Sequence, residues 1–160
     1  MIRKSLLIAM LMLSSALAVS ARLGADIAVV RDSNVLVIDD IRIETERFVV
    51  DSATNTATVE LSLSSLKENP RELKINVYGT QLVDNERNAY YFSTIALGRV
   101  LMRFDDKQNY LNYLLQPNTP AKLIITAEKI LPGATIQVVK IVLEDSAEEG
   151  RFLDAYLSYR

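Results

Sequence analysis

The chain has 160 residues, of which 49% are hydrophobic and 24% charged, and its formal net charge is −2 at pH 7. This length suits one domain with a substantial core, and the balance of apolar and charged residues argues against disorder. A mildly acidic chain without basic clusters lacks the charge expected for nucleic-acid binding. Cysteine and histidine are absent, which excludes disulfides, catalytic triads and Cys/His zinc sites. We therefore expect no enzymatic activity and no cofactor.

The first 21 residues have the three parts of a secretory signal peptide. Arg3 and Lys4 supply the positive start, residues 6–13 form an apolar run, and small residues offer cleavage after Ala18 or Ala21. The apolar stretch is short for a membrane span, so we expect cleavage and no stable membrane insertion afterwards. Export without cysteines fits a bacterial periplasmic or extracellular protein.

Alternation of apolar and polar residues predicts strands along the rest of the chain. Residues 35–50 alternate until Phe48 breaks the parity, which indicates a bend or bulge near residues 45–47. The cleanest alternation is found in residues 56–66, where one face is aliphatic and the other is polar. Both segments are therefore expected to bury a single face.

Residues 71–92 form the segment around which the fold is predicted to be organised. A strand changes parity at Gly79, and a polar turn at residues 84–88 leads to a return strand rich in tyrosine. A glycine at a change of parity indicates a bulge or bend, because glycine adopts backbone angles that other residues avoid. The turn has oxygen ligands at calcium-loop spacing but lacks the later ligands, so we interpret it as an ordinary hairpin turn.

The second half of the chain continues the pattern. Residues 93–104 predict a strand or a strand pair, whereas residues 108–116 fit either a strand or a short helix. A proline-marked turn at residues 117–120 precedes a further strand at residues 121–130. In residues 134–143 both parities carry apolar residues, which indicates a bulge or burial on both faces.

Together these elements predict an all-β fold, an antiparallel sandwich or barrel of about eight to ten strands. The expected organisation is a signal peptide at residues 1–21, a leader or edge strand at residues 22–34, and one sandwich domain at residues 35–160.

Four short stretches follow one another in a recognisable order: Leu82-Val83-Asp84, Asn88-Ala89-Tyr90, Leu115-Gln116-Pro117 with Pro120, and Ile130-Leu131-Pro132. With these turn signals, residues 35–143 resemble uncharacterised immunoglobulin-like domains of bacterial exported proteins. The chain departs from that pattern at Glu86-Arg87, where a tighter glycine turn is expected. The resemblance implies an immunoglobulin-like β-sandwich and export, and it supplies no catalytic residues.

Aromatic residues offer the best candidate binding site, and no metal site is expected. Tyr91, Tyr110, Tyr113 and Asn112 combine amphipathic rings with a hydrogen-bonding amide, which suits recognition of a sugar or a peptide. The alternative is that some of these rings fill the core while the others cover the sheet surface. Since Tyr90 and Tyr91 are neighbours in a strand they must point to opposite faces, and we expect Tyr91 to be the exposed one.

These observations predict a non-catalytic exported binding or structural module. It would act on another envelope protein, or on a second copy of itself, through sheet edges or an aromatic face. Residues 27–30 and 153–159 are the segments expected to add to a neighbouring sheet. The alternative is a periplasmic carrier of a small apolar ligand or peptide, which requires an apolar cavity. A hydrolase, the least favoured interpretation, requires two carboxylates converging in one cleft.

Overall fold

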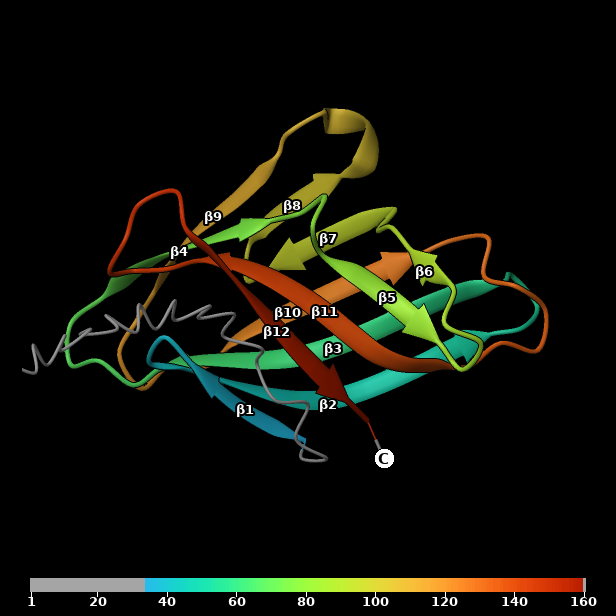
Figure 1. Ribbon diagram of the computed structural model, residues 1–160, viewed down its shortest axis with the longest axis horizontal. Helices are drawn as coiled ribbons and strands as arrows, with labels where there is room; N and C mark the ends of the chain where they lie inside the picture. Colours follow the sequence, from blue (N-terminus) through green and yellow to red (C-terminus); the bar gives the residue numbers. More distant parts are fainter. Residues whose placement is uncertain (1–33, 160) are drawn as a thin grey trace, which may run out of the picture.

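The computed structural model describes residues 34–159, which form two antiparallel sheets packed face to face (Figure 1). The first sheet has the order β1-β2-β3-β10-β7-β8 and comprises β1 (Val35–Ile38), β2 (Ile41–Asp51), β3 (Thr56–Ser65), β10 (Ala121–Ala127), β7 (Thr94–Leu97) and β8 (Val100–Arg103). The second comprises β4 (Arg71–Asn76), β5 (Gln81–Asp84), β6 (Ala89–Tyr90), β9 (Tyr110–Leu115), β11 (Ile136–Glu144) and β12 (Phe152–Ser158). The predicted antiparallel β-sandwich is confirmed.

The described part of the chain has more strands than the eight to ten expected. Residues 71–92 contribute three short strands, and residues 93–104 form the pair β7 and β8. A short 3-10 turn, η1 (Phe104–Asp106), precedes β9, so residues 108–116 contain a strand rather than a helix. Between residues 34 and 159 no helix is long and apolar enough to cross a membrane. The predicted signal peptide and nearly all of the predicted leader lie outside the described residues.

The first sheet follows the alternation of its sequence. Strand β3 pairs with β2 on one side and β10 on the other, and its apolar residues Ala57, Val59, Leu61 and Leu63 are fully buried. The pairing of β2 with β3 shifts by one residue between Thr45 and Arg47. This shift is the predicted bulge, and it explains why Phe48 departs from the earlier parity.

The second sheet is organised around β11. Strand β12 pairs along one edge of β11, because Val139 and Leu143 each face a β12 residue there. The same two residues face Leu82 of β5 and Ile75 of β4 on the opposite edge. Strands β4 and β5 therefore follow one another along a single neighbour, with an insertion between them. The predicted change of parity at Gly79 lies within this insertion.

The insertion is closed by a buried threonine. The backbone N–H of Val142, which faces the gap between β4 and β5, donates to Thr80 Oγ1 over 3.2 Å. Thr80 Oγ1 in turn donates to the carbonyl of Asn76 over 2.9 Å, and Gly79 N–H donates to Asn76 Oδ1 over 3.0 Å. The hydroxyl thus replaces a missing strand carbonyl, so the buried N–H of Val142 keeps a partner.

Gly79 is required for space rather than for an unusual backbone angle, since it is not among the described glycines with positive φ. A Cβ at this position would lie 2.9 Å from Cγ2 and 3.2 Å from Cβ of Val142. We expect Gly79→Ala to lower the free energy of unfolding by about 1–3 kcal/mol through overpacking. Urea titration measures the change, and the loss is expected to shrink in a Val142→Ala background. Equal losses in both backgrounds would contradict the close approach.

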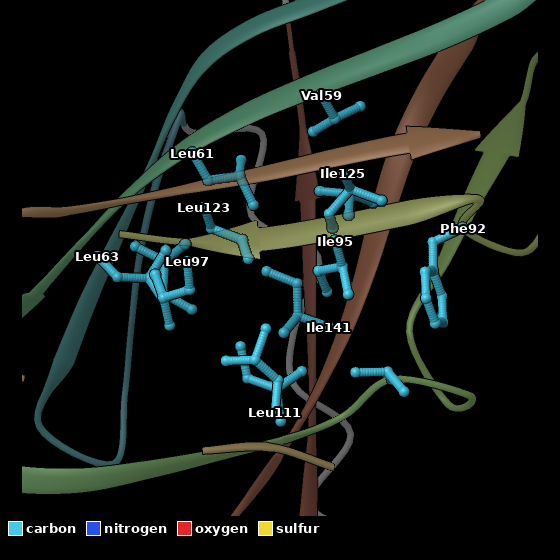
Figure 2. Close-up of a cluster of buried hydrophobic side chains, with 14 of the residues drawn as sticks. Val59, Leu61, Leu63, Phe92, Ile95, Leu97, Leu111, Leu123, Ile125 and Ile141 are labelled. Carbon is cyan, nitrogen blue, oxygen red and sulfur yellow. The ribbon is translucent and has the colours of Figure 1, made fainter. Parts of the chain in front are cut away.

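Predominantly aliphatic side chains from both sheets fill the interior. Figure 2 shows Leu61, Ile95 and Ile125 of the first sheet facing Leu111 and Ile141 of the second, and each is at most 1% exposed. The predicted bulge in residues 134–143 is confirmed, because the pairing of β11 with β5 shifts between Ile136 and Val138. Apolar side chains of both sheets thus occupy the space between them.

Candidate functional site

Four aromatic side chains, Tyr78, Tyr91, Phe92 and Phe104, form one contiguous group, the aromatic cluster. Phe104 is central: its ring centroid lies 5.4 Å from Tyr78, 5.6 Å from Phe92 and 6.4 Å from Tyr91. Phe92 is 3% exposed and belongs to the core, whereas Tyr91 is 53% and Phe104 42% exposed. The cluster therefore connects the core to a solvent-facing aromatic surface.

A buried carboxylate holds the segment that presents Tyr91. Asp84 Oδ1 accepts the backbone N–H groups of Glu86 and Asn88, each over 2.8 Å. Asp84 Oδ2 accepts the Asn88 side-chain amide over 2.9 Å and the Tyr90 hydroxyl over 2.7 Å. Tyr90 is thereby fixed against the core, and the next residue points outward. The predicted exposure of Tyr91 is confirmed.

These hydrogen bonds also explain why residues 84–88 form an ordinary hairpin turn rather than a calcium loop. Burial raises the pKa of Asp84, but the hydrogen bonds from Asn88, Tyr90 and Glu86 outweigh burial and lower that pKa to about 2. Burial and the adjoining carboxylate both raise the pKa of Tyr90. Both oxygens of Asp84 already accept two hydrogen bonds each, so the carboxylate serves to order the loop that carries Tyr91.

The fold is expected to lose part of its stability in acid through Asp84. The folded-state pKa of about 2 lies below the ordinary value of 3.8, so the carboxylate stabilises the fold above pH 3.8 and progressively less as the pH falls toward 2. Asp84→Asn is expected to be less stable than wild type at pH 7, with the difference narrowing below pH 3.8. Urea midpoints between neutral and acid pH measure this, with the exposed Asp105→Asn as control. A pH-independent difference would show that the charge of Asp84 is unimportant.

A groove of about 660 Å³ lies beside the two exposed rings. Tyr91 and Phe104 form its apolar part, and the rest is lined by Ser93, Thr94, Arg103, Asp105, Glu128 and Lys129. The lining thus carries two acidic and two basic side chains around an aromatic centre. An aromatic centre with a polar rim is the composition of protein–protein interfaces.

The structure does not bring the four predicted site residues together. Tyr110 and Asn112 lie on the outer face of the second sheet, where Tyr110 stacks on Phe152 with ring centroids 5.8 Å apart. Tyr113 has the parity of the buried Leu111, so it is half-buried and packs against the core. Tyr113 is therefore one of the rings that pack toward the core rather than cover the sheet surface. Tyr91 alone belongs to the aromatic cluster.

Sequence reasoning missed Phe104. Its parity with Val100 and Met102 predicts the end of a strand, whereas β8 stops at Arg103 and η1 begins with Phe104. The available signal was the Asp105-Asp106 pair directly after it, because a turn beginning at Phe104 releases that ring from the alternation of the sheet.

A second groove gathers acidic residues together with basic ones. This groove, of about 580 Å³, is lined by Glu72, Glu144, Asp145 and Glu149 together with Lys67, Arg71, Lys74, Asn112 and Ser146. Glu144 accepts a hydrogen bond from Lys74 Nζ over 2.9 Å, and this bond lowers the pKa of Glu144. Glu144 is therefore engaged in an ion pair, and it is not a carboxyl group with the raised pKa that the general acid of a glycosidase needs. The described residues also hold no group of three or more side chains arranged for a metal ion.

Comparisons with known proteins give little further information. No family model and no curated protein matches the chain. Among solved structures, the CooA pilin subunit from enterotoxigenic Escherichia coli is similar over 69% of this chain and 84% of that chain, with 12% sequence identity and a TM-score of 0.36. At this TM-score the likeness supports no inference about the function of this chain.

Proposed function

We propose that this protein is an exported, non-catalytic binding module that recognises a protein partner of the bacterial envelope through the aromatic cluster. The observation that carries the proposal is the exposure of Tyr91 and Phe104, at 53% and 42%, next to the buried Phe92 and to Tyr90, whose hydroxyl donates to the buried Asp84. The export part rests on the signal peptide predicted in residues 1–21.

The support of the rings favours binding. Phe104 packs edge-on against both Tyr78 and Phe92, and the Tyr78 hydroxyl donates to the Phe104 carbonyl over 3.4 Å. Tyr91 directly follows Tyr90, whose hydroxyl donates a hydrogen bond to Asp84 Oδ2. Rings held in this way lose little conformational freedom when a partner covers them, so more of the buried area contributes to affinity.

The nearby sheet edge extends the same surface. Strand β8 is last in its sheet, so one of its edges has no strand partner among residues 34–159, and its Leu101 is 56% exposed. The chain passes from β8 directly into Phe104. An extended partner segment can therefore pair with β8 while its side chains contact the aromatic cluster.

Photo-crosslinking in living cells tests the proposal. A photoreactive amino acid replaces Tyr91 in one variant and Leu114 in the matched control, since Leu114 is 50% exposed but lies on the outer face of the other sheet. We expect position 91 to capture one defined envelope protein that position 114 does not. The same set of products at both positions would refute the proposal.

The exposed ring is expected to contribute little to folding. Tyr91→Ala should change the free energy of unfolding by no more than about 0.5 kcal/mol, because it removes a surface side chain that makes no hydrogen bond in the described structure. Urea denaturation of wild type and variant gives the comparison. A loss above about 2 kcal/mol would mean that Tyr91 is a structural residue rather than a binding residue.

A further inference from the structure

One half of β2 lacks a strand on its outer edge. Strand β1 pairs with Ile41–Glu44 only, whereas β3 pairs with β2 as far as Asp51. Residues 47–51 therefore have no strand partner on the edge away from β3 in the described part of the chain. Unpaired edges invite association with other chains, and proteins usually cover them.

An apolar groove lies beside this unpaired edge. It has a volume of about 290 Å³, and its walls include Phe48 and Val50 of β2 together with Leu131, Ala134 and Ile136 of the opposite sheet and the loop before it. Phe48 and Val50 are only half-buried, although both pack against the core, and Leu131 is 48% exposed. The ring of Tyr159, directly after β12, stacks on Phe48 with ring centroids 5.6 Å apart, so the apolar lining is covered in part only.

The first described residue, Asn34, lies at this edge. Thr45 N–H donates to the carbonyl of Asn34 over 2.7 Å, which extends the antiparallel pairing of β1 with β2 to the bulge at residues 45–47. If residues before Asn34 continued the same antiparallel pairing, they would lie along the unpaired half of β2. At about 3.3 Å per residue, the five residues 47–51 need a partner of five or six residues.

We propose that residues 27–32 of the same chain pair with residues 47–51 of β2 as an antiparallel strand and cover the groove with apolar side chains. If the pairing of Val35 with Glu44 continues in the same register, Val30 lies opposite Val49. The bulge at residues 45–47 can displace this register by one residue at most. Opposed residues point to the same face, so the register with Val30 opposite Val49 turns Ile27 and Val29 toward the groove, and the register displaced by the bulge turns Ala28 and Val30 toward it. In these two registers Arg31 or Asp32, respectively, lies opposite Phe48.

Chain connectivity favours the same chain over a second copy. Asn34 already lies on the edge, so residues 27–32 reach it without closing a loop. A strand donated by a second copy would lose translational and rotational freedom on association. Covering this edge within one molecule leaves the aromatic cluster as a separate surface, so this inference does not depend on the proposed function.

Disulfide trapping tests the strand directly, because the natural chain contains no cysteine. Two variants carry Val30→Cys, one with Val49→Cys and the other with Val50→Cys, to allow for both registers. Opposed residues in antiparallel strands have Cα atoms about 4.5 Å or about 5.5 Å apart, depending on the pair, and a disulfide spans either distance. The matched control combines Ala25→Cys with Val49→Cys. We expect a disulfide within the monomer in at least one Val30 variant and free thiols in the control.

Two results would overturn the proposal: disulfide-linked dimers, which would mean that a second copy supplies the strand, or free thiols in both Val30 variants. Hydrogen exchange on the protein without cysteines gives an independent reading. Val30→Pro should speed exchange of amides in residues 47–51 by about tenfold or more, because it disrupts the added strand, while Ala25→Pro should not. Equal exchange in these two variants would also overturn the proposal.

Discussion

Asp39→Asn is expected to lower the free energy of unfolding by about 3 kcal/mol, because it leaves the buried charge of Arg71 without its anion. Arg71 Nη2 lies 2.7 Å from Asp39 Oδ2, and the two side chains are only 7% and 10% exposed. Arg71 Nη1 also donates to the Asp39 carbonyl, while Arg71 Nε is buried without a partner in the described structure. The asparagine cannot neutralise the guanidinium, so its desolvation is no longer offset.

Asp39 connects three separate parts of the chain, which adds to the expected effect. It lies in the turn between β1 and β2, pairs with Arg71 at the start of β4, and accepts the Ser146 hydroxyl over 2.6 Å. Burial raises the pKa of Asp39, but the bonds from Arg71 and Ser146 prevail and lower it. Asparagine is the suitable replacement because Asp39 has a positive φ of 47°, which alanine would adopt with strain.

Urea unfolding measures the effect, with Asp154→Asn as the matched control. Asp154 pairs with Lys140 over 2.9 Å but its side chain is 42% exposed, so its loss should cost less than about 1 kcal/mol. Adding Arg71→Met to Asp39→Asn should restore much of the stability, since both charges are then gone. A loss in Asp39→Asn no larger than that in Asp154→Asn would contradict the role assigned to this ion pair.

Ile141→Ala is expected to lower the free energy of unfolding by about 2–5 kcal/mol, through lost apolar burial and the cavity left behind. Ile141 is fully buried on β11 and faces side chains of the opposite sheet (Figure 2). Val138 of the same strand has the opposite parity and is only half-buried, so Val138→Ala is the control. We expect the control to lose about 1 kcal/mol or less in the same urea titration. Similar losses at both positions would contradict the assignment of the two faces of β11.

Local alternation predicted much of the fold because it reports which face of a strand is buried. It identified the inward face of β3, the bulges near Phe48 and Val138, and the outward direction of Tyr91. Alternation does not report which strand lies beside which. The arrangement of β4 and β5 along one edge of β11 depends on contacts between distant residues, and short-range patterns do not carry this information.

The candidate site was less predictable, because it depends on how turns and distant segments meet. Phe104 joins the aromatic cluster only because β8 ends one residue earlier, and strand ends are poorly defined by pattern. Tyr113 has the parity of Leu111 and Leu115, which indicated an inward direction; the competing helical period obscured that signal. The pairing of Asp39 with Arg71 joins residues far apart in sequence, so composition alone did not single it out.

The most direct test of the proposed function is the affinity of the protein captured at position 91 for three forms of this chain. Wild type, Tyr91→Ala with Phe104→Ala, and the control Leu114→Ala would be compared by titration calorimetry after circular dichroism has shown that each is folded. We expect the double variant to bind at least about 30-fold more weakly, as for a central aromatic pair worth about 2 kcal/mol, and the control to bind like wild type. Unchanged affinity in the folded double variant would contradict recognition through the aromatic cluster.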